Sequence, residues 1–416
     1  MPDASIGMSR LWPPILPAIA GFYFAARLCL TFLFFQSDPK LGAYANFALH
    51  FVLFAVVFLY SFGPPAVALH PIAQSAPLRW AIGFLCMGAC SLTWSVTVSK
   101  PIAFAYWCEL AAEVFIVVCL LQAREVRTVS TAVLQGYVLG ALFIAAVEWL
   151  SPTMYDLRPG NDDFFSPNAI GFTCAFAVFL IQIACRSSFL WRVVAAVLAV
   201  SLLRSLSKTT IVAFVAAQAL LLIMDYSRSW ITRFLLALSA LLVVWTFSGL
   251  LENYYEVYTH LGNQSETLSG RLGIWAFVLE RSVQEPWLGH GFHSFRNVIP
   301  PFGSFEAWHA HNELLQQFYT YGVVGVILVA CLYISLLRQF RSVADPALKA
   351  RLLALWVFIV IRGLADTENF DLSLPLWSVA VISVMLAHAP ARAIGVGLKR
   401  NGSPFISGSL TEECAP

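Results

Sequence analysis

Apolar runs separated by short polar connections fill most of the chain, from about residue 12 to residue 389. Most runs are about 17–25 residues long, the length that an α-helix needs to cross roughly 30 Å of hydrocarbon. Backbone polar groups in lipid must be paired within the spanning structure, so we expect these runs to be helices. The pattern predicts about twelve spans, at residues 12–35, 43–62, 80–95, 101–121, 130–150, 169–185, 188–203, 208–224, 231–250, 312–337, 352–365 and 375–389.

One long polar segment interrupts the pattern between the ninth and tenth spans, at roughly 251–311. A connection of about 60 residues is usually functional. Within it, residues 269–284 place Leu272, Trp275, Leu279 and Val283 at helical spacing, which predicts a helix on the membrane surface or against the bundle. The chain therefore divides into N-terminal spans (1–165), central spans (166–250), the long segment (251–311), C-terminal spans (312–390) and a tail (391–416).

Composition supports an all-α polytopic membrane protein. Hydrophobic residues make up 59% of the chain and charged residues 12%, against about 25% charged in soluble domains. Fifteen of the 25 Lys and Arg residues fall in alternate connections and the termini, so the positive-inside rule predicts that both termini are cytoplasmic. The long segment then faces the opposite side. Eight of the nine cysteines lie in apolar runs, which indicates neither a disulfide framework nor a zinc motif.

Several polar residues depart from this pattern. Arg204 and Lys208 share the short outer turn before the eighth span, where a helix N-terminus and two cations suit an anion; the alternative is snorkelling at the interface. Ser166 and Pro167 predict a helix start, and Asn168 beside them is a candidate lipid or sugar contact. Three charges lie at membrane depth: Arg27, Glu109 and Glu113. They predict an internal ion pair or, alternatively, an ion pathway.

The strongest candidate for chemistry is the junction W-H-A-H-N-E-L at 308–314, where a polar loop meets an apolar helix that begins at about Asn312. A neutral imidazole there can act as a general base toward a sugar hydroxyl. If the loop is extended, His309 and His311 point to different sides. The competing hypothesis is a zinc site made by His290, His293, His309 and His311.

These residues resemble the signatures of bacterial O-antigen ligases and their polysaccharide-polymerase relatives. His311-Asn312, nine residues and Gly322-x-x-Gly325 resemble H-N-x9-G-x-x-G. The stretches P-W-L-G-H-G-F (286–292), S-G-R-L-G-I-W (269–275) and L-S-K-T-T (206–210) are similar to three further elements of that group. The family position at Lys208 is commonly arginine, and lysine lacks the guanidinium fork that binds phosphate bidentately; Arg204 is the candidate to compensate.

The resemblance implies a metal-independent glycosyltransferase of GT-C-like architecture in the bacterial inner membrane, without cofactor and without nucleic-acid partners. It implies that a glycan passes from undecaprenyl diphosphate to the hydroxyl of lipid A-core or of a lipid-linked glycan. His311 is implied to be the base, and Arg271 and Lys208 are implied to bind the diphosphate. Arg204, Asn312, His309 and Asn168 remain candidate substrate contacts, and Gly322 and Gly325 are expected to be structural.

Two functional alternatives remain open. Lipid A-core is a polyanion, so a ligase should present a basic acceptor groove, whereas residues 251–311 contain three Arg and six Glu. That balance favours a polymerase weakly. A transporter or flippase of lipid-linked oligosaccharide is the rival of a different class, and it depends on the buried charges.

Overall fold

The computed structural model describes residues 14–35, 37–62, 74–150, 159, 165–185, 188–224, 229–231, 233–234, 271–296, 298–299, 307–368 and 370–388. These ranges are built from helices and contain no β-strand. The helices are α1 (Ile15–Ala26), η3 (Arg27–Cys29), α2 (Leu30–Phe34), α3 (Pro39–Tyr60), α5 (Ala76–Ser91), α6 (Lys100–Ala123), α7 (Val126–Leu150), α8 (Pro167–Ala184), α9 (Phe189–Arg204), α10 (Lys208–Met224), α13 (Arg271–Ser282), α14 (Glu313–Arg341), α15 (Pro346–Gly363) and α16 (Leu376–Ala387).

The expected helical membrane fold is confirmed in outline. Every expected span except 231–250 coincides with a helix, and nearly all of 231–250 lies outside the described residues. Within the described ranges, six segments are long and apolar enough to cross a membrane: Ile15–Phe34, Lys40–Tyr60, Lys100–Ala123, Val126–Leu150, Pro167–Ala184 and Glu313–Arg341. The protein is therefore a multi-pass helical membrane protein, while the total of twelve spans and the place of the long segment among them stay predictions.

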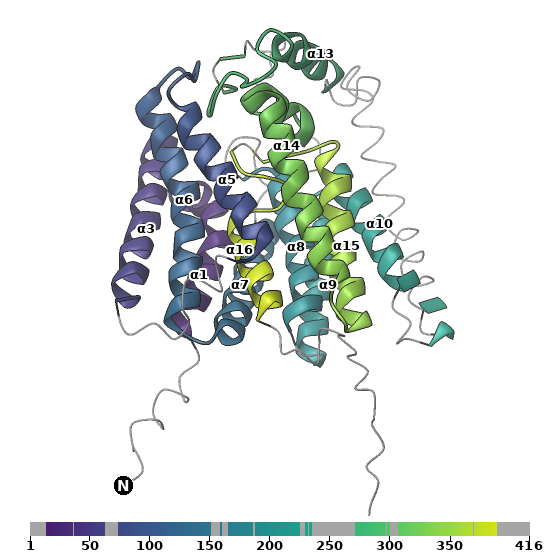
Figure 1. Cartoon of the computed structure of the whole chain (residues 1–416). Helices are drawn as coiled ribbons and strands as arrows, with labels where there is room; N and C mark the ends of the chain where they lie inside the picture. Colours follow the sequence, from purple (N-terminus) through teal and green to yellow (C-terminus); the bar gives the residue numbers. More distant parts are fainter. Residues whose placement is uncertain are drawn as a thin grey trace, which may run out of the picture.

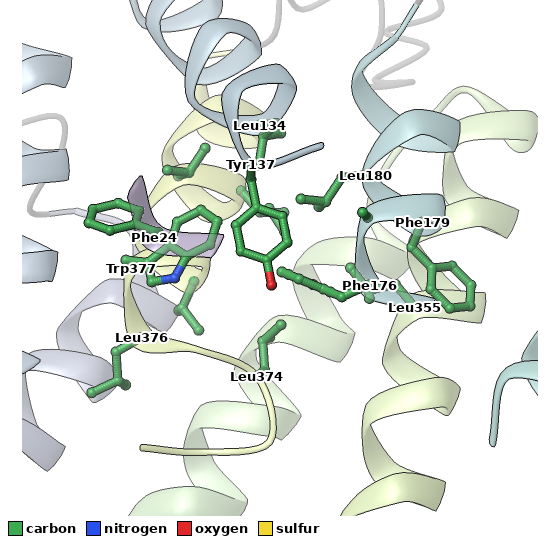
Figure 2. Packing of buried hydrophobic residues seen from close by; sticks show 14 of the residues in the cluster. Phe24, Leu134, Tyr137, Phe176, Phe179, Leu180, Leu355, Leu374, Leu376 and Trp377 are labelled. Atoms are coloured by element: carbon green, nitrogen blue, oxygen red, sulfur yellow. The ribbon is translucent and has the colours of Figure 1, made fainter. Parts of the chain in front are cut away.

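The helices stand side by side as a bundle, with α13 lying across one end (Figure 1). Figure 2 shows the packing at its centre, where α1, α7, α8, α15 and α16 meet. Tyr137 of α7 packs edge-on against Phe176 of α8 with ring centroids 5.4 Å apart, and Trp377 of α16 lies 5.3 Å from Tyr137 and 5.0 Å from Phe24 of α1. Because α16 is apolar on all sides, it is buried within this core.

Close backbone contact joins α1 to α7. A Cβ atom at Gly21 would overlap the carbonyl of Val133, and one at Gly136 would overlap the carbonyl of Ala18. Small residues let membrane helices approach until their backbones touch, and van der Waals packing then stabilises the pair. The sequence positions of Gly21 and Gly136 thus fix how the N-terminal spans join the rest of the bundle.

The membrane-depth charges form the internal ion pair expected from the sequence. Arg27 lies where α1 breaks into η3, and its guanidinium is 2.8 Å from Glu109 and 2.5 Å from Glu113 of α6. His50 of α3, which is fully buried, lies 3.6 Å from Glu109. Mutual pairing lowers the cost of holding these charges inside the bundle.

Helix α14 is broken at Gly322, whose φ of +63° lies in the left-handed region that favours glycine. The break frees backbone groups that the loop 286–291 satisfies. The amides of His290 and Gly291 donate to the carbonyls of Tyr319 and Thr320 at 2.9 and 2.8 Å, and the amide of Val323 donates to the Pro286 carbonyl at 2.8 Å. This loop therefore packs directly against α14 at the break.

The helix predicted within 269–284 is present as α13. Its buried face differs from the apolar row that the sequence predicted. Ile274 and Val278 are buried against a small cluster that includes Phe295, Ala310 and Tyr319. The indole nitrogen of Trp275 donates to the Ala310 carbonyl at 2.9 Å. Leu272, Leu279 and Val283 are exposed. The contact ties α13 to the residues that immediately precede α14.

Candidate active site

Five helix ends meet on the side of the bundle that α13 covers. The first residues of α8, α10, α13 and α14 come together there with the end of α15. The contacts that join them are the Ser207 hydroxyl to Asn168 Oδ1 (3.0 Å), Arg271 Nη1 to Thr209 Oγ1 (3.2 Å) and to the Ala365 carbonyl, and Asn312 Nδ2 to the Leu364 carbonyl (2.8 Å). Helix N-termini carry partial positive charge, so their convergence favours an anionic ligand.

His311 lies at the centre of this junction. Its Nδ1 is 3.3 Å from Oδ1 of Asp366, a long but usable hydrogen bond. If Nδ1 carries the proton toward the carboxylate, Nε2 keeps its lone pair and can accept a proton from another group. The backbone of His311 has a φ of +51°. Left-handed backbone is costly for a non-glycine residue and, where it persists, often marks a functional site.

Asp366 is buried and held by positive partners. Oδ2 lies 3.6 Å from Nη2 of Arg362, and Oδ1 accepts the backbone amide of Thr367 at 3.1 Å. Burial alone would raise the pKa of Asp366, but Arg362 and His311 outweigh it and hold that pKa below its usual range. The carboxylate is therefore ionised at neutral pH and can stabilise a positively charged imidazole.

Arg362 connects this carboxylate to a second acid and to α8. Its Nη2 donates to Glu368 at 2.9 Å, and its guanidinium lies over the ring of Phe172 at 4.2 Å. The side chain is 2% exposed. Because a buried guanidinium needs fixed partners, Arg362 sets the position of Asp366 and thereby of His311.

His309 stands beside His311, with ring centroids 4.1 Å apart. The expectation that the two rings point to different sides applied to an extended loop, and the left-handed φ of +51° at His311 shows that the loop is not extended there. His309 Nδ1 accepts the backbone amide of His311 at 3.2 Å, which requires a lone pair on that nitrogen. Burial lowers the pKa of His309 well below its usual value, and the neighbouring His311 lowers it further, while Asp366 opposes them in part. His309 is therefore neutral.

Arg271 is the first residue of α13, and its guanidinium reaches the carbonyl of Ala365, next to Asp366. It also donates to Thr209, the second residue of α10. Lys208, exposed at the first position of α10, is adjacent in sequence. The structure therefore brings Arg271 and the start of α10 to the loop that carries Asp366, within reach of His311.

The remaining candidates from the sequence have partners within the protein. Asn312 caps α14 by accepting the Leu315 amide at 3.0 Å.

Arg204 turns toward α7, donating to the Glu148 carbonyl at 2.5 Å and stacking 4.6 Å from the ring of Trp149. Asn168 accepts from Ser207. The helix start at Ser166-Pro167 is confirmed, with Ser166 accepting the Ala169 amide. The proposed substrate contacts of these residues stay predictions.

Sequence reasoning did not identify Asp366, Glu368 or Thr209 as site residues. A signal was present in the stretch I-R-G-L-A-D-T-E-N-F-D at 361–371, where an arginine near the end of an apolar span is followed by three acidic residues. Charges at a span end are ordinary, so the stretch by itself does not distinguish a site from a membrane boundary. Asp366, which pairs with His311, lies 55 residues further along the chain.

The four histidines of the metal hypothesis are not brought together. Among the described residues, the grouping that could hold a cation is His309, His311 and Asp366, whose ligand atoms lie within 4.8 Å of one another. His290 stacks on Tyr319 at 4.4 Å, and His293 is 2.7 Å from the Thr97 hydroxyl. The guanidiniums of Arg362 and Arg271 approach the three-residue grouping and oppose a further cation.

Comparison with known proteins gives concordant findings. Residues 193–330, about a third of the chain, match the family model described as "O-Antigen ligase". The chain is 26% identical over 129 residues to a "Putative polysaccharide ligase" of Rickettsia conorii, and 28% identical over 129 residues to a protein of the same description from Rickettsia felis. Each alignment covers 28% of this chain and 31% or 32% of the relative, so it spans about a third of either protein.

The resemblance predicted from the motifs is thereby confirmed for this segment. The matched range contains Lys208, Arg271, His311 and Gly322, and it ends before Asp366. The part of the site that lies beyond residue 330 is therefore described by the structure alone.

Proposed function

We propose that this chain is a membrane glycosyltransferase that moves a glycan from a lipid diphosphate donor to an acceptor hydroxyl, with His311 as the general base. The observation that carries the proposal is the pairing of His311 Nδ1 with the ionised Asp366, 3.3 Å away, beside a loop that Arg271 holds. The family match at 193–330 supports a ligase-type activity.

The reaction requires three things from the protein. The acceptor hydroxyl gives its proton to His311 Nε2 as its oxygen forms a bond to the anomeric carbon of the donor sugar. The bond from that carbon to the phosphate oxygen breaks, and its electron pair leaves with the lipid diphosphate. Asp366 stabilises the imidazolium that forms and keeps the ring in the orientation that points Nε2 away from the carboxylate.

Arg271 is proposed to neutralise the departing diphosphate, helped by Lys208. A planar guanidinium matches two phosphate oxygens, and fixed positive groups stabilise charge that develops in the transition state. The guanidinium is already anchored by Thr209 and Ala365, so little reorganisation is needed when the donor arrives. Because the donor carries its own leaving group, this scheme uses no metal, and activity should survive treatment with a chelator.

Undecaprenyl diphosphate is the donor lipid that we propose, at the outer face of the bacterial inner membrane. The acceptor is either lipid A-core, which makes the protein an O-antigen ligase, or another lipid-linked glycan, which makes it a polymerase of O-antigen or exopolysaccharide. The product distinguishes them: glycan attached to lipid A in the first case, and long free or lipid-linked polysaccharide in the second.

The transporter hypothesis depended on unexplained charges at membrane depth. Arg27 pairs with both Glu109 and Glu113. An internal pair that joins α1 to α6 accounts for these charges without an ion pathway.

Replacing His311 tests the proposal. His311→Ala should lower transfer by about 10²–10⁴-fold, the usual contribution of a general base. His311→Asn is the companion variant, because asparagine accepts a positive φ more readily than alanine and preserves the backbone. His388→Ala at the far end of the bundle is the matched control. Transfer by His311→Asn at the rate of the His388→Ala control, with equal protein in the membrane, would refute the assignment.

A further inference from the structure

A groove lies at the end of the bundle opposite His311. Helix α14 begins beside His311 and reaches this end about 25 residues later, roughly 37 Å away at 1.5 Å per residue. Here α5, α14 and the end of α16 border a groove of about 850 Å³. This volume is in the range of sites that hold small molecules or a lipid head group.

The walls of the groove change from apolar to polar along the bundle axis. One stripe of α14 lines it, in the order Cys331, Ile334, Ser335, Arg338, Gln339 and Ser342. These positions recur every three or four residues and so share one face of the helix. The deeper positions are mainly apolar and those near the helix end are polar. Trp80 of α5 stands on the facing wall, half-exposed as aromatic side chains at membrane interfaces commonly are.

The polar end of the groove favours a phosphate. The guanidinium of Arg338 lies there, and so does the start of α5, where Ala76 and Leu78 carry backbone N–H groups and Pro77 carries none. Ser75 occupies the N-cap of α5 and is 5% exposed, yet its hydroxyl has no hydrogen-bond partner. A buried hydroxyl without a partner is costly, and a phosphate oxygen at the helix start would satisfy it. The described residues that line the groove include no carboxylate.

A further unpaired atom points to a hydrogen-bond donor in the same ligand. Gln339 Nε2 donates to the Ser383 carbonyl at 2.7 Å, which fixes the orientation of the amide, and Gln339 Oε1 has no partner. The unpaired oxygens of Ser75 and Gln339 are closed to solvent in this conformation. A head group with both a phosphate and a hydroxyl or ammonium donor would satisfy Arg338, Ser75 and Gln339 together once these two side chains turn toward the groove. Phosphatidylglycerol has this chemistry, whereas phosphatidylcholine lacks the donor and a polyprenyl phosphate lacks any head group beyond the phosphate.

We propose that this groove binds one phospholipid with an anionic, hydrogen-bond-donating head group, its phosphate at Arg338 and the start of α5 and its acyl chain along Ile334 and Trp80. The lipid completes the polar contacts of α5, α14 and α16 at the end of the bundle remote from His311. This site is independent of the transfer reaction and of its donor lipid.

Native mass spectrometry of the full chain tests the proposal. The detergent-purified, delipidated protein is titrated with phosphatidylglycerol and with phosphatidylcholine of the same acyl chains. We expect one phosphatidylglycerol to bind with clear preference. Arg338→Gln should weaken that binding roughly tenfold, as expected for the loss of a charged hydrogen bond. Arg341→Gln is the matched control, because Arg341 is exposed at the same helix end and does not line the groove.

A second variant separates charge from shape. Ser335→Trp fills the groove while keeping Arg338, and it should abolish the preferred phosphatidylglycerol adduct. Equal binding of the two phospholipids, equal loss in Arg338→Gln and Arg341→Gln, or unchanged binding in Ser335→Trp would each overturn the proposal. Preference for undecaprenyl phosphate over phosphatidylglycerol would also overturn it, by showing that the site selects a bare lipid phosphate.

Discussion

Replacing Asp366 by asparagine examines the coupling between the carboxylate and His311. Asparagine has nearly the same shape and can still accept a hydrogen bond from Nδ1, so the ring need not move. What disappears is the negative charge that faces the imidazole 3.3 Å away. The variant therefore separates the electrostatic contribution of Asp366 from its role in positioning the ring.

The size of the effect follows from the geometry. Two unit charges about 4 Å apart interact by about 4 kcal/mol at the effective dielectric of a protein site. Asp366 is 2% exposed, so solvent screens this interaction little. If the imidazolium is formed in the transition state, losing that energy lowers the rate by nearly a thousandfold, at about 1.4 kcal/mol per tenfold. We expect a loss of about 10²–10³-fold, since some rearrangement compensates.

The ionisation of Asp366 limits how the rate and the stability can depend on pH. Because the pKa of Asp366 lies below its usual range, its carboxylate stays charged at neutral pH. Its contribution to stability is present above about pH 4 and is lost only as the pH falls further. Titration of Asp366 therefore does not account for a change in rate between about pH 5 and pH 8.

The assay is transfer from a purified lipid-linked donor by the full chain in detergent or nanodiscs, with initial rates measured against pH. Glu368→Gln is the matched control. Glu368 accepts a hydrogen bond from the same Arg362, at 2.9 Å, and is 33% exposed. The reasoning is refuted if Asp366→Asn keeps the wild-type rate, or if Glu368→Gln, at equal protein level, loses as much activity.

Three further outcomes are expected. Arg271→Lys should lower kcat/KM for the donor at least tenfold because it loses the bidentate fork, whereas Arg281→Lys on the same helix should leave it unchanged; equal values would exclude a diphosphate contact. Gly322→Ala should lower the thermal midpoint, since left-handed backbone costs about 1–2 kcal/mol and the new Cβ would overlap the neighbouring loop. Gly273→Ala should leave the thermal midpoint unchanged, because its new Cβ meets no atom within 4 Å. Because the pKa of His309 is lowered by burial, the free energy of unfolding should fall as the pH drops below about 6.5, by at most about 1.4 kcal/mol per pH unit. His309→Asn should make this dependence on pH less steep. An unchanged slope in unfolding measurements would contradict the neutral state of His309.

The sequence was sufficient to predict the spans because the bilayer imposes a length and a composition on each one separately. The helix starts at Ser166-Pro167 and Asn312 were likewise readable, since capping depends on a few adjacent residues. The pairing of Arg27 with Glu109 and Glu113 followed from the cost of burying charge. These features are local, or they follow from the membrane as solvent.

Other features depend on where distant segments meet. The motif residues Arg271 and His311 were visible in the chain, but their shared contact with the loop at 365–366 was not, because that loop follows a separate helix. The same is true of Arg204, which the sequence placed beside Lys208 and which the fold turns toward Glu148. A cation on a surface turn has several partners within reach, and only the packing of the neighbouring helices selects one.

Hydrophobic pattern and motif spacing by themselves determined that this chain is a helical membrane protein with a histidine at the start of a membrane span. The tertiary structure decided which carboxylate faces that imidazole, which way the left-handed turn at His311 directs the ring, and that α14 breaks at Gly322. The reason is physical. Burial in lipid acts on each segment independently, whereas the partner of a buried polar group is set by the closest approach of helices that are far apart in the sequence.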